Sequence, residues 1–169
     1  MGVEPDREAA EVGAESGLDI KCGYLQGMNF AEGSFQIITL FEVIEHLTEP
    51  IALMRECRRI LEPSGRMFIT TGNTRSWTVR FVQEKWDYFA LRLGHISFFN
   101  PASMVRLAEK AGFEVVRIET RSFTAQNGLS PSNLERFAKK MLGEALNWPA
   151  KMCQRGHDIF AVLKKKETS

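Results

Sequence analysis

The sequence predicts a single α/β domain with a layered, largely parallel sheet. Apolar runs of strand length alternate with segments whose apolar residues recur at helical spacing, which is typical of α/β proteins. The strongest strand signal is the β-branched, nearly continuous apolar run at residues 35–41, a pattern typical of a strand covered on both faces. With 169 residues, of which 44% are hydrophobic and 25% charged, the chain can form one domain with a substantial core.

The first half of the chain contains four predicted strands and two predicted helices. A short strand at the amino terminus is cut by Pro5, and a helix over residues 7–16 ends at Gly17. A weak strand at residues 20–24 and the apolar run at 35–41 come next. The helix expected over residues 50–61 has one apolar and one charged face, and residues 63–65 (Pro-Ser-Gly) should end it before a strand at 66–71.

The second half continues the alternation. A helix is predicted over residues 101–111, with Asn100 as its N-cap and Gly112 after its last turn. A strand at 113–120, a helix at 131–148 and a strand at 157–164 follow. Layered α/β sheets bind ligands at the carboxyl ends of their strands, so functional residues are expected directly after the predicted strands.

Charge and cysteine content narrow the function classes. Lys plus Arg (22) and Asp plus Glu (21) nearly cancel, which argues against a nucleic-acid substrate. The three cysteines are widely spaced and form no C-x-x-C pair, as expected for reduced thiols in the cytoplasm. Neither a membrane span nor a signal peptide is predicted, because no apolar stretch approaches about 18 residues.

Five sequence blocks occur in an order that resembles the class I S-adenosylmethionine-dependent methyltransferase family, in particular the ubiquinone-biosynthesis O-methyltransferases. The resemblance implies a Rossmann-like sheet with helices on both faces and an antiparallel last strand. It also implies S-adenosyl-L-methionine as the cofactor. The blocks lie at residues 2–6, 30–35, 42–47, 61–66, and 94–99 followed by 107–113.

The resemblance also implies roles for residues near the cofactor. Glu4 would accept hydrogen bonds from the two ribose hydroxyls, since one carboxylate can accept from two donors. Many family members have an acid facing the adenine where this chain has Tyr24 and Gln26, so backbone groups and Gln26 would substitute for it. The alternatives are a solvated Glu4 and ordinary core positions for the apolar residues. The residues assigned to the cofactor are Glu4, Pro5, Tyr24, Leu25, Gln26, Leu40 and Phe41.

The family's first strand and glycine-rich turn have no counterpart in the sequence. They should precede the ribose-binding acid by about 20 residues, whereas Glu4 stands three residues after Met1. We therefore expect an amino-terminally incomplete domain whose flanking strands have open edges, and such edges favour self-association. A truncated gene model, a fragment, and a degenerate domain repaired by another chain are the three explanations.

Acidic and histidine residues cluster after the predicted strand at 35–41. Glu42, Glu45 and His46 are spaced i, i+3 and i+4 on an expected helical turn, and the resemblance brings His95 to the same place. The set resembles the metal site of small-RNA 2′-O-methyltransferases and would suit Mg, Mn, Fe or Zn. In one alternative Glu45 and His46 act without a metal and His46 is the general base. In another the acids only cap or form salt bridges.

Residues 1–169 are expected to form one incomplete methyltransferase domain, with residues 74–100 as an aromatic lid over the substrate. An aromatic stripe that only covers the sheet is the alternative for that segment. The predicted function is methyl transfer to a small-molecule acceptor, at an oxygen. The competing prediction is a catalytically silent methyltransferase-like module that binds a partner.

Overall fold

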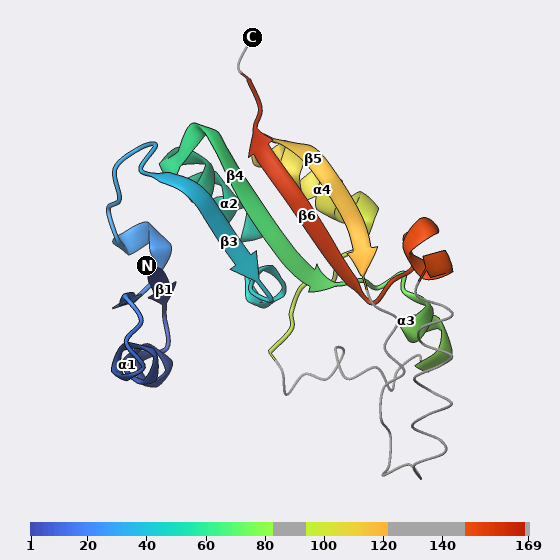
Figure 1. Ribbon diagram of the computed structural model, residues 1–169, viewed down its shortest axis with the longest axis horizontal. Coiled ribbons are helices and arrows are strands. Elements are labelled where there is room, and N and C mark those ends of the chain that lie inside the picture. The colour runs from blue at the N-terminus through green and yellow to red at the C-terminus, as the bar shows by residue number, and fades with distance from the viewer. Residues whose placement is uncertain (83–93, 122–147, 168–169) are drawn as a thin grey trace.

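The computed structural model describes residues 1–82, 94–121 and 148–167, which form two sheets with helices beside them (Figure 1). The smaller sheet pairs two short parallel strands, and helix α1 (Arg7–Glu15) connects them. The Asp6 side chain caps α1 by accepting a hydrogen bond from the Ala9 N–H at 2.8 Å. The strands of the smaller sheet are β1 (Gly2–Glu4) and β2 (Ile20–Cys22).

The larger sheet has four strands in the order β3-β4-β6-β5. Strands β3 and β4 are parallel, and β6 is antiparallel to both of its neighbours, β4 and β5. The antiparallel last strand expected from the resemblance is therefore confirmed. The four strands are β3 (Phe35–Phe41), β4 (Leu61–Gly72), β5 (Phe113–Arg121) and β6 (Asp158–Lys165).

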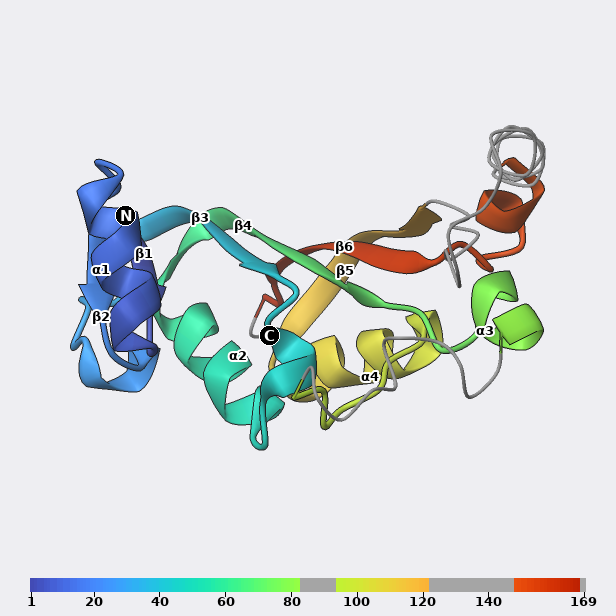
Figure 2. The same cartoon turned by 90° about the horizontal axis from the view of Figure 1, so that it is seen from below.

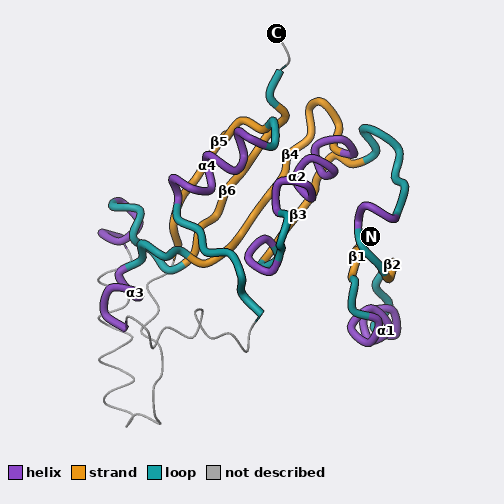
Figure 3. Tube along the Cα trace, turned by 180° about the vertical axis from the view of Figure 1, so that it is seen from behind, coloured by secondary structure: helices purple, strands orange, loops and turns teal. Residues whose placement is uncertain are grey.

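Helices α2 (Pro50–Ile60) and α4 (Pro101–Lys110) lie on the same face of the larger sheet (Figure 2). The apolar faces predicted for both helices are buried against it. Figure 3, seen from behind, shows the two helices in front of the strands. The core between the layers includes Met54, Cys57, Leu61, Met104, Ala108, Phe113 and Ile159.

The opposite face of β3 is open in the described part of the chain. Ile37 is 62% exposed and Phe41 54% exposed, whereas Leu40, on the other face, is buried. The apolar run at 35–41 predicted a strand covered on both faces, and in the described residues helix cover is present on one face only. Strand β3 also stands at an edge of its sheet, next to the smaller sheet.

Helix and strand boundaries agree closely with the sequence pattern, with one difference at β4. Asn100 and Ser103 form a reciprocal capping box at the start of α4, and Gly112 adopts φ 83° after its end. Strand β4 begins at Leu61, ahead of the segment that was predicted to separate helix from strand. Its register with β3 shifts there, and a Cβ at Gly65 would lie 2.9 Å from the Gln36 carbonyl oxygen. The predicted break is thus an irregularity within a longer strand.

The expected aromatic lid lies partly outside the described residues, as does the helix predicted over 131–148. At the start of the lid segment, Trp77 begins the short helix α3 (Trp77–Val82). At its end, Phe99 is 7% exposed and belongs to the hydrophobic core. Across the three described ranges, no helix has the length and apolar character that a membrane crossing requires.

Candidate active site

A cavity of about 500 Å³ separates the smaller sheet from the edge of β3. Its lining includes the segment that follows β2, where the short 3-10 helix η1 (Leu25–Gly27) begins, and the carboxyl end of β3. The volume suits a small-molecule site. Five of the residues predicted to bind the cofactor line this cavity: Pro5, Tyr24, Leu25, Gln26 and Leu40.

Glu4 and Phe41 were also predicted to bind the cofactor, but they are not among the residues that line the cavity. Glu4 ends β1 beside the carboxyl end of β2, where its carbonyl oxygen accepts a hydrogen bond from the Gly23 N–H at 2.8 Å. Its carboxylate accepts a hydrogen bond from the Asp6 N–H at 2.9 Å. The acid therefore stands at the carboxyl end of β1, next to Pro5, which does line the cavity.

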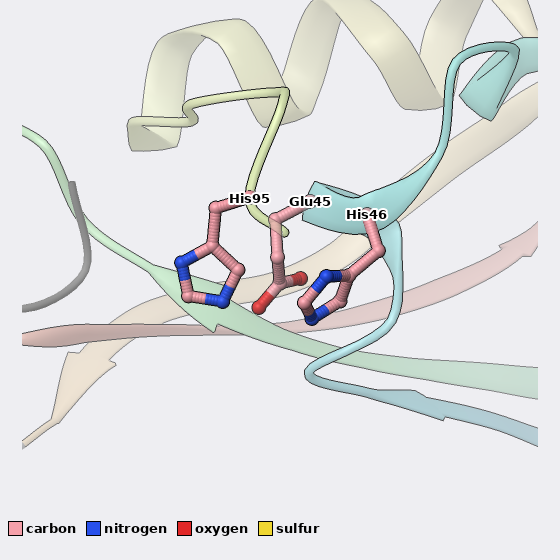
Figure 4. A group of neighbouring side chains, drawn as sticks. All are labelled: Glu45, His46 and His95. Carbon is pink, nitrogen blue, oxygen red and sulfur yellow. The ribbon is translucent and has the colours of Figure 1, made fainter. Parts of the chain in front are cut away.

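A second group of predicted site residues lies where β3 and β4 end, around the 3-10 helix η2 (Ile44–His46). Glu45 is fully buried, and its Oε2 accepts a hydrogen bond from the Thr71 hydroxyl at 3.0 Å. Glu45 Oε1 is buried without a hydrogen-bond partner. An unpartnered buried oxygen is costly, and the Glu45 carboxylate lies between the imidazoles of His46 and His95 (Figure 4).

His46 and His95 complete this group. Their ring centroids are 4.6 Å apart, and ligand atoms of Glu45, His46 and His95 all lie within 4.8 Å of one another. His46 is exposed, and its Nδ1 lies 3.2 Å from the Gly94 carbonyl oxygen. When Nδ1 donates to that carbonyl, Nε2 carries the lone pair and can accept a proton or bind a metal.

The backbone holds the two histidines in place. The Glu45 carbonyl oxygen accepts hydrogen bonds from the Ile96 and Ser97 N–H groups, both at 2.9 Å. His95 therefore comes from a segment that is fixed directly onto η2, although 48 residues lie between it and His46 in the sequence. The structure thus brings His95 beside Glu45 and His46, and a shared role in binding a metal stays a prediction.

Glu42 is placed differently from the other three predicted metal ligands. It precedes η2, adopts φ 53° and is not part of the group of close ligand atoms, so Glu42, Glu45 and His46 do not share the one helical face that their spacing predicted. Loss of hydration and the charge of Glu45 raise the pKa of Glu42 to about 7, against a hydrogen bond from Thr70 that lowers it. Because Glu42 is exposed, water screens the repulsion between the carboxylates of Glu42 and Glu45.

The sequence analysis missed Asp158 and Thr71. Asp158 starts β6 and pairs with Gly72, which brings a third carboxylate near Glu42 and Glu45. Burial raises the pKa of Asp158 and the charge of Glu45 adds to the effect, while His157 opposes it. The antiparallel direction of the last strand was the available signal, because it places the amino end of β6 at the carboxyl ends of β3 and β4.

Comparison with protein families identifies the domain. A family model described as a methyltransferase domain matches residues 1–118, which is more than half of the chain. The chain belongs to this methyltransferase family. The matched region includes Glu4, the Glu45 and His46 pair, and His95.

Curated relatives of this methyltransferase domain carry the name ubiquinone biosynthesis O-methyltransferase. The protein from Idiomarina loihiensis is 27% identical over 122 residues, which cover 68% of this chain and 50% of the relative. The protein from Parvibaculum lavamentivorans is 40% identical over 65 residues, which cover 38% of this chain and 25% of that relative. The chain thus spans about half the length of the first of these relatives and less of the second.

Solved structures share the fold. A Thermotoga maritima protein described as a SAM-dependent methyltransferase, possible histamine N-methyltransferase, superposes with a TM-score of 0.72 at 18% identity, covering 98% of this chain and 73% of its own. A SAM-dependent methyltransferase from Archaeoglobus fulgidus gives a TM-score of 0.68 at 14% identity. The superposition covers 97% of this chain and 75% of the Archaeoglobus fulgidus chain. The two sheets of this methyltransferase domain therefore have the Rossmann-like arrangement of complete methyltransferases.

Proposed function

We propose that the chain is the larger part of an S-adenosylmethionine-dependent methyltransferase that methylates an oxygen of a small-molecule acceptor. The main support is the cavity between β1, β2 and β3, which Pro5, Tyr24, Leu25, Gln26 and Leu40 line, with the Glu45, His46 and His95 cluster close to the carboxyl end of β3. The relatives named as O-methyltransferases favour oxygen as the acceptor atom. The near-neutral charge favours a small acceptor over nucleic acid.

In this proposal the cofactor supplies a methyl group already activated on a sulfonium, so the protein mainly positions and desolvates the reactants. Glu4 binds the ribose hydroxyls through the carboxylate at the end of β1. Tyr24, Leu25 and Gln26 border the adenine, and Leu40 packs beside the adenosine. Tyr24, Leu25, Gln26 and Leu40 line one cavity, and Glu4 precedes Pro5 in that lining, which supports these roles.

His46 is the proposed general base for the acceptor hydroxyl. Its imidazole is exposed, and a hydrogen bond from Nδ1 to the Gly94 carbonyl would leave Nε2 as the proton acceptor. Glu45 is buried beside it and would stabilise the imidazolium that forms. Replacing His46 by Gln should lower kcat with little change in KM, and the rate should recover partly at high pH, where the acceptor ionises by itself.

A divalent metal held by Glu45, His46 and His95 is a second proposal for the same cluster. The unpartnered Oε1 of Glu45 and two imidazoles provide one oxygen and two nitrogens, a set that suits Mg, Mn, Fe or Zn. Two ligands at about 2.1 Å from one ion lie at most about 4.2 Å apart, so the side chains must close slightly. A bound ion would lower the pKa of an acceptor hydroxyl.

Calorimetry with S-adenosylhomocysteine tests cofactor binding. We expect binding at micromolar concentration by the chain extended with a strand and glycine-rich turn before Met1, and at least about a tenfold loss for Glu4→Gln, since the amide keeps one acceptor oxygen for the two ribose hydroxyls and loses the charge that strengthens both hydrogen bonds. Glu8→Gln, on the exposed side of α1, is the matched control and should bind normally. Absence of binding in both the original and the extended chain would support a silent partner-binding module instead.

Elemental analysis and calorimetry with Mn²⁺ test the metal. His95→Ala and Glu45→Gln should both abolish binding of the ion, whereas His157→Ala, outside the cluster, should retain it. Full activity in strong chelator, with no ion bound to the purified protein, would eliminate the metal and leave His46 as the base. Location in the cytoplasm and self-association through open strand edges remain predictions that sedimentation and cell fractionation can test.

A further inference from the structure

A second cavity, of about 440 Å³, lies at the opposite edge of the larger sheet from β3. Its walls come from the start of α4, from the edge strand β5 and from the turn at residues 153–156, which precedes β6. No residue that lines it also lines the cavity between the two sheets. The volume lies within the range of small-molecule sites, so the second cavity is a separate candidate for ligand binding.

The lining of this cavity combines positive charge with apolar surface. Arg75 and Arg155 provide two guanidinium groups, and no acidic residue is present among the described residues of the lining. Val105 of α4 and Ile118 of β5 are two of its apolar members. A cavity bordered by charges of one sign favours a ligand of the opposite sign, and the apolar walls favour a ligand that also has an apolar part.

The two guanidinium groups lack an acidic partner in the part of the chain that the structure describes. Neither Arg75 nor Arg155 forms a salt bridge there. Arg59, by contrast, forms a salt bridge with Glu56 at 2.6 Å. Arg155 Nη1 donates a hydrogen bond to the Arg75 carbonyl oxygen at 2.9 Å, so the Arg155 guanidinium lies against the backbone that carries the other arginine. An anion would therefore meet two positive charges from one direction.

A buried asparagine fixes the backbone that carries both arginines. Asn73 is fully buried, its Oδ1 accepts a hydrogen bond from the Arg75 N–H at 3.0 Å, and its Nδ2 donates to the Gly156 carbonyl oxygen at 2.8 Å. The Arg155 carbonyl oxygen accepts from the Trp77 N–H at 2.9 Å, and Figure 1 shows the segment before β6, in red, beside α3. This arrangement exists without a ligand, which lowers the entropic cost of binding one.

We propose that this cavity binds a small organic carboxylate. The carboxylate group pairs with the guanidinium groups of Arg75 and Arg155, and the apolar part of the ligand packs against Val105 and Ile118. A guanidinium is a planar fork of N–H donors, which matches the two oxygens of a carboxylate. Inorganic anions have no group that could contact the apolar walls, so they should bind more weakly.

Hexanoate is the direct probe, with neutral hexanamide and inorganic phosphate for comparison. In an NMR titration of the full chain, we expect saturable binding of hexanoate and at least about fivefold weaker binding of the other two compounds. Arg75→Gln should weaken hexanoate binding by at least about fivefold, and Arg155→Lys, which keeps the charge but not the fork, by at least about threefold. Arg106→Gln is the matched control, because Arg106 is exposed on α4 but does not line the cavity, and it should change binding by less than about twofold.

Cys153 provides a second readout, because it lines the cavity and is exposed. Iodoacetate and iodoacetamide both alkylate a thiolate with loss of iodide, but only iodoacetate carries a carboxylate. We expect the ratio of the iodoacetate rate to the iodoacetamide rate to be at least about threefold higher at Cys153 than at Cys22, which is exposed elsewhere. Hexanoate should slow the alkylation of Cys153 and not that of Cys22, and Arg75→Gln should remove the preference for iodoacetate.

Four results would each overturn the proposal. They are equal binding of hexanoate and hexanamide, phosphate binding as tight as that of hexanoate, equal effects of Arg75→Gln and Arg106→Gln, and alkylation of Cys153 that hexanoate does not slow. None of these measurements uses the cofactor or methyl transfer. A chain that binds hexanoate as expected but fails to bind S-adenosylhomocysteine would support the carboxylate site and count against the proposed function alone.

Discussion

Replacing Glu42 by Gln should make the protein more stable at high pH and leave its stability unchanged in acid. Loss of hydration and the Glu45 charge raise the pKa of Glu42 from 4.5 to about 7 in the folded state, a rise of about 2.5. The folded protein then binds more protons than the unfolded chain between these two values. The contribution of Glu42 to the stability of the wild-type protein must therefore fall as the pH rises from about 4.5 through about 7.

The full pKa rise corresponds to about 3.4 kcal/mol, at about 1.36 kcal/mol for each pH unit. Glu42 is exposed, so solvent screening reduces this figure, and we expect a difference of about 1–2 kcal/mol at pH 8. Gln keeps the size of the side chain and has no charge to repel Glu45. The difference between Glu42→Gln and the wild type should disappear towards pH 4, where both side chains are neutral.

Urea unfolding from pH 4 to pH 8 in the presence of chelator measures the effect. Glu119→Gln is a control of opposite sign, because a hydrogen bond from Arg121, assisted by Arg117, lowers the pKa of Glu119. That variant should lose stability near neutral pH, and the loss should shrink as the pH falls through the lowered folded pKa. Parallel pH profiles for the wild type and Glu42→Gln would refute the electrostatic account of the Glu42 site.

Three further predictions concern the core, a helix end and a thiol. Met54→Ala should cost about 2–5 kcal/mol in urea unfolding because Met54 is fully buried, whereas Met152→Ala, at a residue 67% exposed, should cost less than about 0.5 kcal/mol. Asn100→Ala removes the capping box of α4 and should lower the unfolding free energy by about 1 kcal/mol; an unchanged midpoint would contradict the capping role. Burial raises the pKa of Cys57 to about 12, so iodoacetamide should modify the other two cysteines in the folded protein and reach Cys57 only in urea, as mass spectrometry would show.

Much of the fold was predictable because periodicity reports directly on burial. The apolar run at 35–41 gave the limits of β3, and the stripe on residues 101–110 gave the buried face of α4. The elements that pack on each face of β3 were not predictable. Periodicity shows that a strand can be buried, but it does not show which element buries it. The early start of β4 was also missed, because Pro63 and Gly65 indicate a loop unless the partner strand allows a register shift.

The candidate site was predictable where a local motif and the resemblance acted together. The local spacing placed Glu45 beside His46, the resemblance added His95, and ligand atoms of the three residues lie close together. Glu42 was assigned to the same helical face because an i, i+3, i+4 spacing assumes a regular turn, whereas its φ of 53° places it outside η2. Asp158 was missed because it reaches the site through strand pairing, which sequence spacing does not report.

The position of β6 has a consequence for how the domain folds. This strand is the last in the chain, yet it lies between β4 and β5 and pairs with both. During synthesis β4 and β5 cannot become part of one sheet until residues 158–165 have left the ribosome. Assembly of the larger sheet is therefore a late, long-range step, and nascent chains that stop before residue 158 should be prone to aggregation.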